Sequence, residues 1–321
     1  MTVQLSPSKW NLMVPFITSP ELPIEEEQLL NLDSIHAKLQ PLSFGYSSLL
    51  VEDLESPEAA HEVFGSLRIG LLAMSLNLSC GMRVRSKVEI LAEDSPMPNR
   101  VGVPIIYPDG KDLSRLLVSH LSVRLQVGKV MPTVLQSLAF GMESDSARQA
   151  TEDDRVSLAL ELYSDSYFET SDSARFLGLV NVLEVLKDTN DSSDAACALI
   201  DRWTAEAGQQ LDSDEAKSIM GSLGYMRQIS ISRGIGSAVC RHLGNERVKE
   251  AQRLYTTRSG LVHDGIRLDG TFDALTTAQR LVTELLAHIL QSGSLKLCML
   301  IRPYWFLRKM HDADGLSQWM R

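Results

Sequence analysis

Short apolar runs separated by turn signals fill the first third of the chain, a pattern typical of a domain that mixes strands and helices. The runs Trp10–Ile17 and Leu42–Val51 predict two strands, and Val84–Leu91 and Val101–Tyr107 predict two more. Between the first two strands, several prolines and the acidic run Glu25–Glu27 predict solvated loops.

A helix is predicted to follow the second strand. Ser56 can cap it, Pro57 suits its first position and the acidic Glu58 favours its first turn. The helical spacing of apolar residues continues to about Leu78. The inner face of this helix is predicted to carry Val63, Leu67, Leu71, Met74 and Leu78.

The segment after the predicted strands begins with a turn signal, Pro108-Asp109-Gly110. Helices are predicted over Lys111–Val127 and Pro132–Gly141. The composition then becomes polar and charged in ESDSARQATEDD, and we place a domain boundary there, between residues 143 and 144. The sequence thus predicts an α+β domain over residues 1–143.

Residues 144–321 are almost entirely helical in pattern. Amphipathic helices with short polar connections predict an all-α antiparallel helical bundle. The expected helices run from Thr151 or Glu152 to Tyr163, then over Asp172–Lys187, Ser193–Ala207, Ser213–Tyr225, Asn245–Val262 (with Asn245 as N-cap) and Thr271–Leu290, before a mixed tail over Leu295–Lys309. The second of these has the apolar stripe Phe176, Leu179/Val180, Leu183 and Leu186/Lys187.

Composition excludes several protein classes. A net charge of −10 argues against a protein that coats nucleic acid through bulk charge. The four cysteines (Cys80, Cys197, Cys240, Cys298) form no C-x-x-C pair, which predicts reduced cytoplasmic thiols and no zinc site. The N-terminus lacks the pattern of a signal peptide, and no apolar run is long enough to span a bilayer. We therefore expect a cytoplasmic protein with no membrane partner.

Charge is distributed unevenly along the chain. Eight basic residues and three acids give the segment from Arg227 to Arg267 a local charge of +5, within a chain of −10. One interpretation is a solvated basic face that compensates acidic helices nearby. The other is a local anion site suited to phosphates.

The segment LYTTRSGLVHDG contains the pair Arg258 and His263 within a helical pattern. Arg258 falls on the apolar stripe of Val248, Ala251 and Leu254, where an arginine must be paired with an internal carboxylate or kept for a ligand. Asp264 and Gly265 follow as a helix stop. Arg115 and His120 share the same spacing, but without this context they predict the polar flank of an ordinary helix.

This motif, with the helix RFLGLVNVLEVL upstream of it, resembles a HEPN domain of the Apea-like branch over roughly residues 151–292. The resemblance implies a helical bundle that dimerises and joins two Arg-x4-His motifs in one cleft. It also implies a metal-independent endoribonuclease with no cofactor, in a toxin–antitoxin or phage-defence setting with an antitoxin or regulatory partner. Two departures are Ser259 after the arginine and Asp264 before Gly265.

The two residue types suit metal-free cleavage of RNA. A base that removes the proton of the 2′-hydroxyl lets that oxygen attack the adjacent phosphate. Histidine fits the proton transfers, because its ordinary pKa lies near neutrality. The planar fork of arginine binds phosphate oxygens and stabilises the charge that develops there. His263 is thus the expected acid/base and Arg258 the phosphate-binding group.

The spacing restricts how these two residues can act together. Five residues along a straight α-helix leave their side chains roughly 140° apart. Either the helix loosens at Ser259-Gly260, or Arg258 and His263 act from different protomers.

Four further residues are candidates for RNA or phosphate binding or for support of the site. Tyr255 lies one turn before Arg258, Ser259 follows it, and Arg253 belongs to the basic segment. Glu184 lies among apolar neighbours on the predicted helix Asp172–Lys187, where it can pair with Arg258 and orient the guanidinium or simply neutralise it.

Three functions remain open. The first is a homodimeric HEPN-type endoribonuclease acting on RNA, for which the α+β domain could serve as a sensor. The second is a catalytically silent HEPN-like module that binds RNA, a nucleotide or a protein partner. The third is a structural or regulatory helical protein in which the motif is coincidental.

Overall fold

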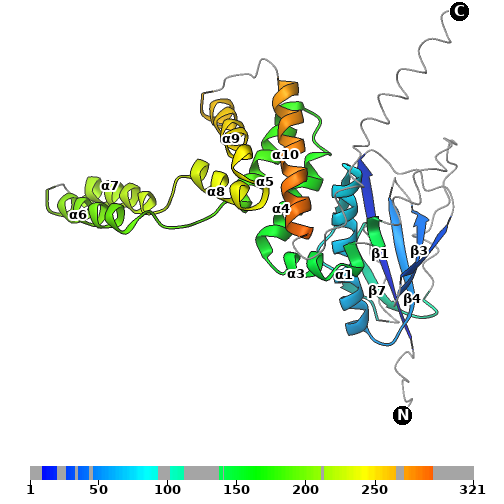
Figure 1. Ribbon diagram of the computed structural model, residues 1–321. Helices are drawn as coiled ribbons and strands as arrows, with labels where there is room; N and C mark the ends of the chain where they lie inside the picture. Colours follow the sequence, from blue (N-terminus) through cyan, green and yellow to red (C-terminus); the bar gives the residue numbers. More distant parts are fainter. Residues whose placement is uncertain are drawn as a thin grey trace, which may run out of the picture. The chain divides into compact units, whose positions relative to one another are not determined.

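The computed structural model describes residues 9–19, 27–32, 35–42, 46–92, 102–111, 137–139, 141–210, 213–264 and 271–291 (Figure 1). The chain divides into two compact units: Ser171–His288 form the second, and the segments before and after it belong to the first. The first unit contains a sheet and the second is helical, which confirms the predicted order of an α+β part followed by a helical part. The predicted boundary at residue 143 falls before two helices that belong to the first unit.

The first unit is built on one seven-stranded sheet. Its strands follow the order β2-β3-β4-β1-β7-β6, and β5 also pairs with β1. All pairings are antiparallel except β6 with β7. The strands are β1 (Trp10–Ser19), β2 (Gln28–Leu32), β3 (Ile35–Pro41), β4 (Ser47–Leu54), β5 (Gly81–Val84), β6 (Glu89–Ile90) and β7 (Ile105–Pro108).

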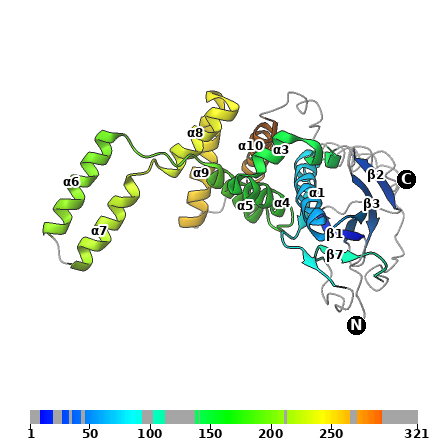
Figure 2. The same ribbon diagram turned by 90° about the horizontal axis from the view of Figure 1, so that it is seen from below.

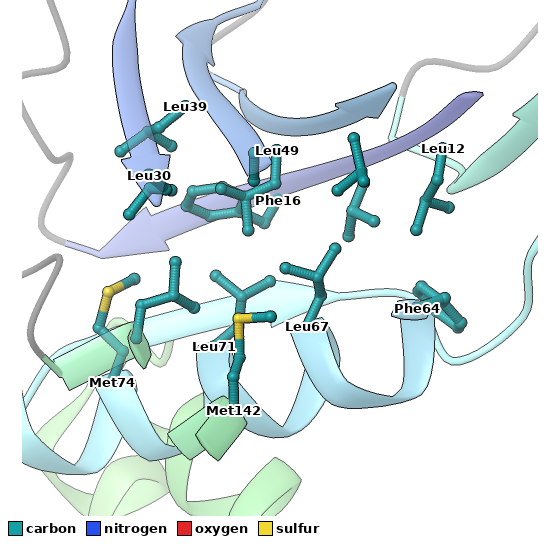
Figure 3. Close-up of a cluster of buried hydrophobic side chains, with 14 of the residues drawn as sticks. Leu12, Phe16, Leu30, Leu39, Leu49, Phe64, Leu67, Leu71, Met74 and Met142 are labelled. Carbon is teal, nitrogen blue, oxygen red and sulfur yellow. The ribbon is translucent and has the colours of Figure 1, made fainter. Parts of the chain in front are cut away.

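Strand β1 lies at the centre of this sheet, where it pairs with β4, β5 and β7. It is buried on both faces, as central strands are. Leu12 and Phe16 belong to the larger core cluster, and Met13, which points the opposite way, belongs to a second cluster with Ile105 and Tyr107. Figure 3 shows the larger cluster, in which side chains of the sheet meet those of a long helix.

That helix, α1 (Pro57–Leu78), matches its prediction. The Ser56 hydroxyl accepts a hydrogen bond from the Ala59 N–H at 3.2 Å, and Ser79 ends the helix in the left-handed conformation. The predicted inner face is buried at Leu67, Leu71, Met74 and Leu78, whereas Val63 is only partly buried.

The strand predictions are only partly correct. Strands β2 and β3 occupy the region predicted as loops, and their burial of Leu30, Ala37 and Leu39 against the core is stabilised by pairing with β4. The segment Val84–Leu91 divides between β5 and β6 instead of forming one strand. The predicted turn at 108–110 is present, with Gly110 at φ +82°. Residues 112–127 of the helix predicted over Lys111–Val127 lie outside the described residues.

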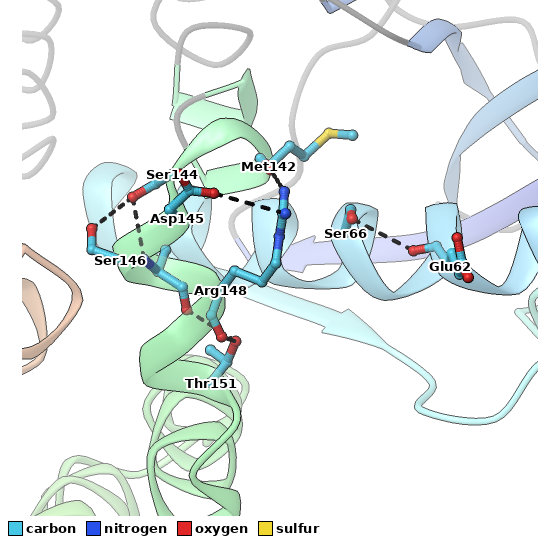
Figure 4. A network of polar contacts seen from close by, with 9 residues as sticks. Glu62, Ser66, Met142, Ser144, Asp145, Ser146, Arg148 and Thr151 are labelled. Atoms are coloured by element: carbon cyan, nitrogen blue, oxygen red, sulfur yellow. Dashed lines mark hydrogen bonds and ion pairs between the residues drawn. The ribbon is translucent and has the colours of Figure 1, made fainter. Parts of the chain in front are cut away.

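Two further helices of the first unit both contact α1. They are α3 (Asp145–Thr151) and α4 (Asp154–Ser166). Figure 4 shows the turn before α3, where Arg148 donates to the Met142 carbonyl at 3.3 Å and Ser144 caps the helix. α4 begins two or three residues after the predicted start at Thr151 or Glu152, because Asp153 caps it by accepting from the Arg155 N–H.

The second unit contains six α-helices among the described residues. They are α5 (Asp172–Leu186), α6 (Asp194–Gln210), α7 (Ser213–Met226), α8 (Ile231–Leu243), α9 (Val248–His263) and α10 (Thr271–Gln291). α5, α8 and α9 contact one another, and α6 packs against α7 as a hairpin (Figure 2). Ion pairs from Arg247 to Glu284 and from Arg280 to Glu250 tie α10 to the segment that begins α9. These contacts confirm a helical bundle.

Five of these six helices match predicted ones, and α8 was missed. Asn245 is also not the N-cap of α9: it begins a short 3-10 turn, Asn245–Arg247, and Arg247 precedes α9 without a side-chain cap. Gly234 and Gly236 disfavour α8 in the sequence, but both are needed for close packing. A Cβ on Gly234 would lie 2.5 Å from the Asp188 carbonyl oxygen, and one on Gly236 3.1 Å from Val248.

Gly234→Ala should destabilise the protein, although alanine is the better helix former, because the new methyl group would overlap the Asp188 carbonyl oxygen. We expect a loss of about 1 to 3 kcal/mol in the free energy of unfolding, measured by urea denaturation. Gly221→Ala in α7 is the matched control, because a Cβ there meets nothing within 4 Å and should stabilise by up to about 1 kcal/mol. A stabilising Gly234→Ala would contradict the packing of α8.

Candidate functional site

Helix α9 carries both residues of the Arg-x4-His motif. It packs inward through the buried Ala251 and Leu254 and contacts α5 and α8. The helix is continuous to His263, and the Asp264 N–H still donates to the Gly260 carbonyl at 3.1 Å. The helix therefore does not loosen within the motif, which removes one of the two arrangements that the spacing allowed.

Glu184 of α5 lies directly against the guanidinium of Arg258. The Arg258 Nε and Glu184 Oε1 atoms are 3.1 Å apart, and each side chain is 22% exposed. Both atoms are buried, and neither has a hydrogen-bond partner among the described residues. The two atoms are close enough for a hydrogen bond, but the angle between them is unsuitable, so the contact is an ion pair only. This pairing neutralises a charge that the apolar stripe could not otherwise accommodate.

The remaining candidates differ in exposure. His263 is exposed at the last position of α9, and Arg253 is exposed nearly three turns before it. Tyr255 and Ser259 are partly exposed. The structure thus brings Arg258 together with Glu184 but not with His263, in agreement with the wide angular separation along a straight helix.

Half of the basic residues between Arg227 and Arg267 are neutralised by carboxylates. Arg227 pairs with Asp201, Arg241 with Asp188, Arg247 with Glu250 and Glu284, and Arg258 with Glu184. Within the described residues, Arg233, Lys249 and Arg253 form no ion pair. The excess positive charge in the sequence is therefore largely compensated by acids from other helices.

A buried carboxylate that the sequence did not reveal links α5 to α8. The Asp188 side chain is 8% exposed, accepts from the Ser237 hydroxyl at 2.6 Å and pairs with Arg241. Beside it the His242 and His288 rings meet edge to face, with centroids 5.6 Å apart. Burial lowers the pKa of His242, the charges of His288 and Arg241 lower it further, and Asp188 acts in the opposite direction.

Neither a metal site nor a membrane-spanning helix is found in the described part of the chain. Its His, Cys, Asp and Glu side chains form no group of three or more that could hold a metal ion. None of its helices combines the length and apolar character needed to cross a bilayer. Comparison with known proteins gives no match among family models, curated proteins or solved structures.

The lowered pKa of His242 predicts how stability depends on pH. The folded state resists protonation of His242 more than the unfolded state does. This histidine therefore contributes most to the free energy of unfolding above the ordinary histidine pKa of 6.5, and that contribution falls as the pH decreases. His242→Gln should lose less stability than the wild type between about pH 7.5 and pH 5. Urea denaturation at both pH values measures the difference, and equal losses in the two proteins would contradict it.

The ion pair predicts a coupling between Glu184 and Arg258. Glu184→Gln should cost about 2 kcal/mol, because it leaves the mostly buried guanidinium unpaired, and much less when Arg258→Met is already present. A double-mutant cycle by urea denaturation should give a coupling of about 1 kcal/mol or more. His263→Ala is the control and should change stability by less than about 0.5 kcal/mol. Additive effects of the two substitutions would show that the pair contributes no coupling.

Proposed function

We propose that this protein is a metal-independent endoribonuclease of HEPN type, whose active site combines two copies of the chain. The observation that carries the proposal is that Glu184 Oε1 lies 3.1 Å from Arg258 Nε, beside the stem of the guanidinium. Among the described residues no second carboxylate pairs with Arg258. A carboxylate at one edge fixes the plane of the fork and leaves its other edge for a phosphate.

In this proposal His263 transfers protons. Its imidazole is exposed, and imidazole is the side-chain group that ordinarily takes up and releases protons near neutral pH, as removal of a 2′-hydroxyl proton requires. The oxygen then attacks the adjacent phosphorus, the bond to the 5′-oxygen breaks, and the products carry a 2′,3′-cyclic phosphate and a 5′-hydroxyl. A second imidazole, or water, returns a proton to the leaving 5′-oxygen.

Arg258 supports the same reaction by binding the phosphate. Its guanidinium stays charged and stabilises the negative charge that builds on the phosphate oxygens. Since a continuous α9 keeps Arg258 and His263 on different sides, the site needs the histidine of a second copy. A two-fold dimer supplies it, because the same surface then meets itself.

A second candidate is a catalytically silent module of the same type that binds RNA, a nucleotide or a protein partner. The neutralisation of Arg258 by Glu184 favours this alternative, because a paired arginine attracts phosphate less strongly than a free one. Ser259, one of the two departures from the family motif, also favours it.

Cleavage of end-labelled mixed RNA in EDTA separates the two candidates. The wild-type protein should cut RNA and leave cyclic-phosphate ends, because neither proposed role requires a metal. His263→Ala should lower the rate by about 100-fold or more, since it removes the proton-transfer group. His61→Ala, which removes an exposed histidine from the first unit, should cleave at the wild-type rate.

Two results would overturn the nuclease proposal. One is cleavage that disappears in EDTA, and the other is cleavage that persists unchanged in His263→Ala. Absence of cleavage together with retained RNA binding would favour the silent module.

A further inference from the structure

The first unit contains a cavity that the proposed nuclease does not use. Its volume is about 350 Å³, and it is bounded by α1, by β5 with the residues that follow it, and by α4. Its charged lining consists of Arg68, Arg83, Arg85, Lys87, Glu161 and Asp165. Four basic residues therefore surround one hollow in a chain whose net charge is −10.

The walls of this cavity are fixed to each other. Ser164 of α4 accepts a hydrogen bond from the Met82 N–H of β5 at 2.6 Å and donates one to the Met82 carbonyl at 2.7 Å. Arg83 lies over the Phe168 ring, 4.4 Å from its centroid. A ligand would consequently meet a largely preformed site, which reduces the cost of ordering it on binding.

Two of the four cations are already paired across the cavity. Arg68 pairs with Glu161, and Arg83 pairs with Asp165 at 2.8 Å. Arg85 and Lys87 are exposed and have no carboxylate partner within the described ranges. The lining thus carries a surplus of two positive charges, both on the same short segment after β5.

Arg68 has an unused donor. Its side chain is 18% exposed, and its Nε atom is buried without a hydrogen-bond partner among the described residues. Burial lowers the pKa of the Arg68 guanidinium, because the charged form loses contact with water. Buried donors are nearly always hydrogen-bonded in proteins, and a ligand acceptor could reach this Nε only if the Arg68 side chain moved.

We propose that this cavity binds a small phosphate-bearing molecule of about mononucleotide size. The volume falls within the usual range of about 300 to 1,000 Å³ for small-molecule sites. Arginine forks match phosphate oxygens in pairs, and Arg85 and Lys87 supply the two charges that a phosphate group requires. The limited volume of the hollow suits a small molecule, and the acidic net charge opposes binding of long nucleic acid.

Calorimetric titration of the full chain with inorganic pyrophosphate at low ionic strength tests this site. The wild type should bind pyrophosphate. The double variant Arg85→Ala/Lys87→Ala, the pocket variant, should bind it at least about tenfold more weakly, because it removes the surplus charge. Arg202→Ala/Lys217→Ala is the matched control, since it removes two exposed basic residues of α6 and α7 and changes the net charge equally. The control should bind as the wild type does.

A second variant is designed to raise the affinity for pyrophosphate instead of lowering it. Glu161→Gln/Asp165→Asn releases Arg68 and Arg83 from their carboxylates and should tighten pyrophosphate binding about tenfold. The thermal unfolding midpoint of each variant checks that it is folded, and Arg85→Gln/Lys87→Gln replaces the alanine variant if that one is not.

Three outcomes would overturn the proposal. The first is no pyrophosphate binding by the wild type, and the second is equal pyrophosphate binding by the wild type and the Arg85→Ala/Lys87→Ala variant. The third is that this variant no longer binds a short single-stranded RNA but still binds pyrophosphate as the wild type does. The last would identify a polymer site. Because the pocket variant leaves Arg258 and His263 unchanged, its metal-free RNA cleavage reports on the nuclease proposal separately.

Discussion

The ion pair between Arg258 and Glu184 is the contact on which the interpretation of the second unit depends. A guanidinium on the apolar stripe of α9 is tolerated only with a carboxylate beside it, and α5 provides that carboxylate. The pair joins two helices of the bundle, and α9 continues unbroken past it to His263. The same contact therefore stabilises the fold and keeps the two motif residues on different sides of one helix.

The two units distribute their charges differently. In the second unit, carboxylates from neighbouring helices neutralise half of the basic residues between Arg227 and Arg267, so a strongly basic segment does not produce a strongly basic surface. In the first unit, only two of the four cations around the cavity are paired. Ion pairing, rather than the count of basic residues, thus determines where an anion finds uncompensated charge.

Features encoded locally were predictable from the sequence. The cap, proline and apolar spacing of α1 lie within the helix itself, and helical periodicity placed Glu184 where it could reach Arg258. Features that depend on distant segments were not. Strands β2 and β3 form through pairing with β4, and α8 tolerates Gly234 because the Asp188 carbonyl leaves no room for a side chain. The basic cavity was missed because its cations lie on α1 and the segment around β5, whereas its wall with Glu161 and Asp165 comes from α4, far along the sequence.

Complementation between protomers tests the composite site most directly. Arg258→Ala and His263→Ala chains, co-expressed with different tags, would form mixed dimers in which one site retains an intact arginine from one chain and an intact histidine from the other. We expect about a quarter of wild-type RNA cleavage in the mixture and none in either variant alone, since half of the dimers are mixed and each mixed dimer has one intact site of two. An inactive mixture that still contains mixed dimers would contradict the shared site.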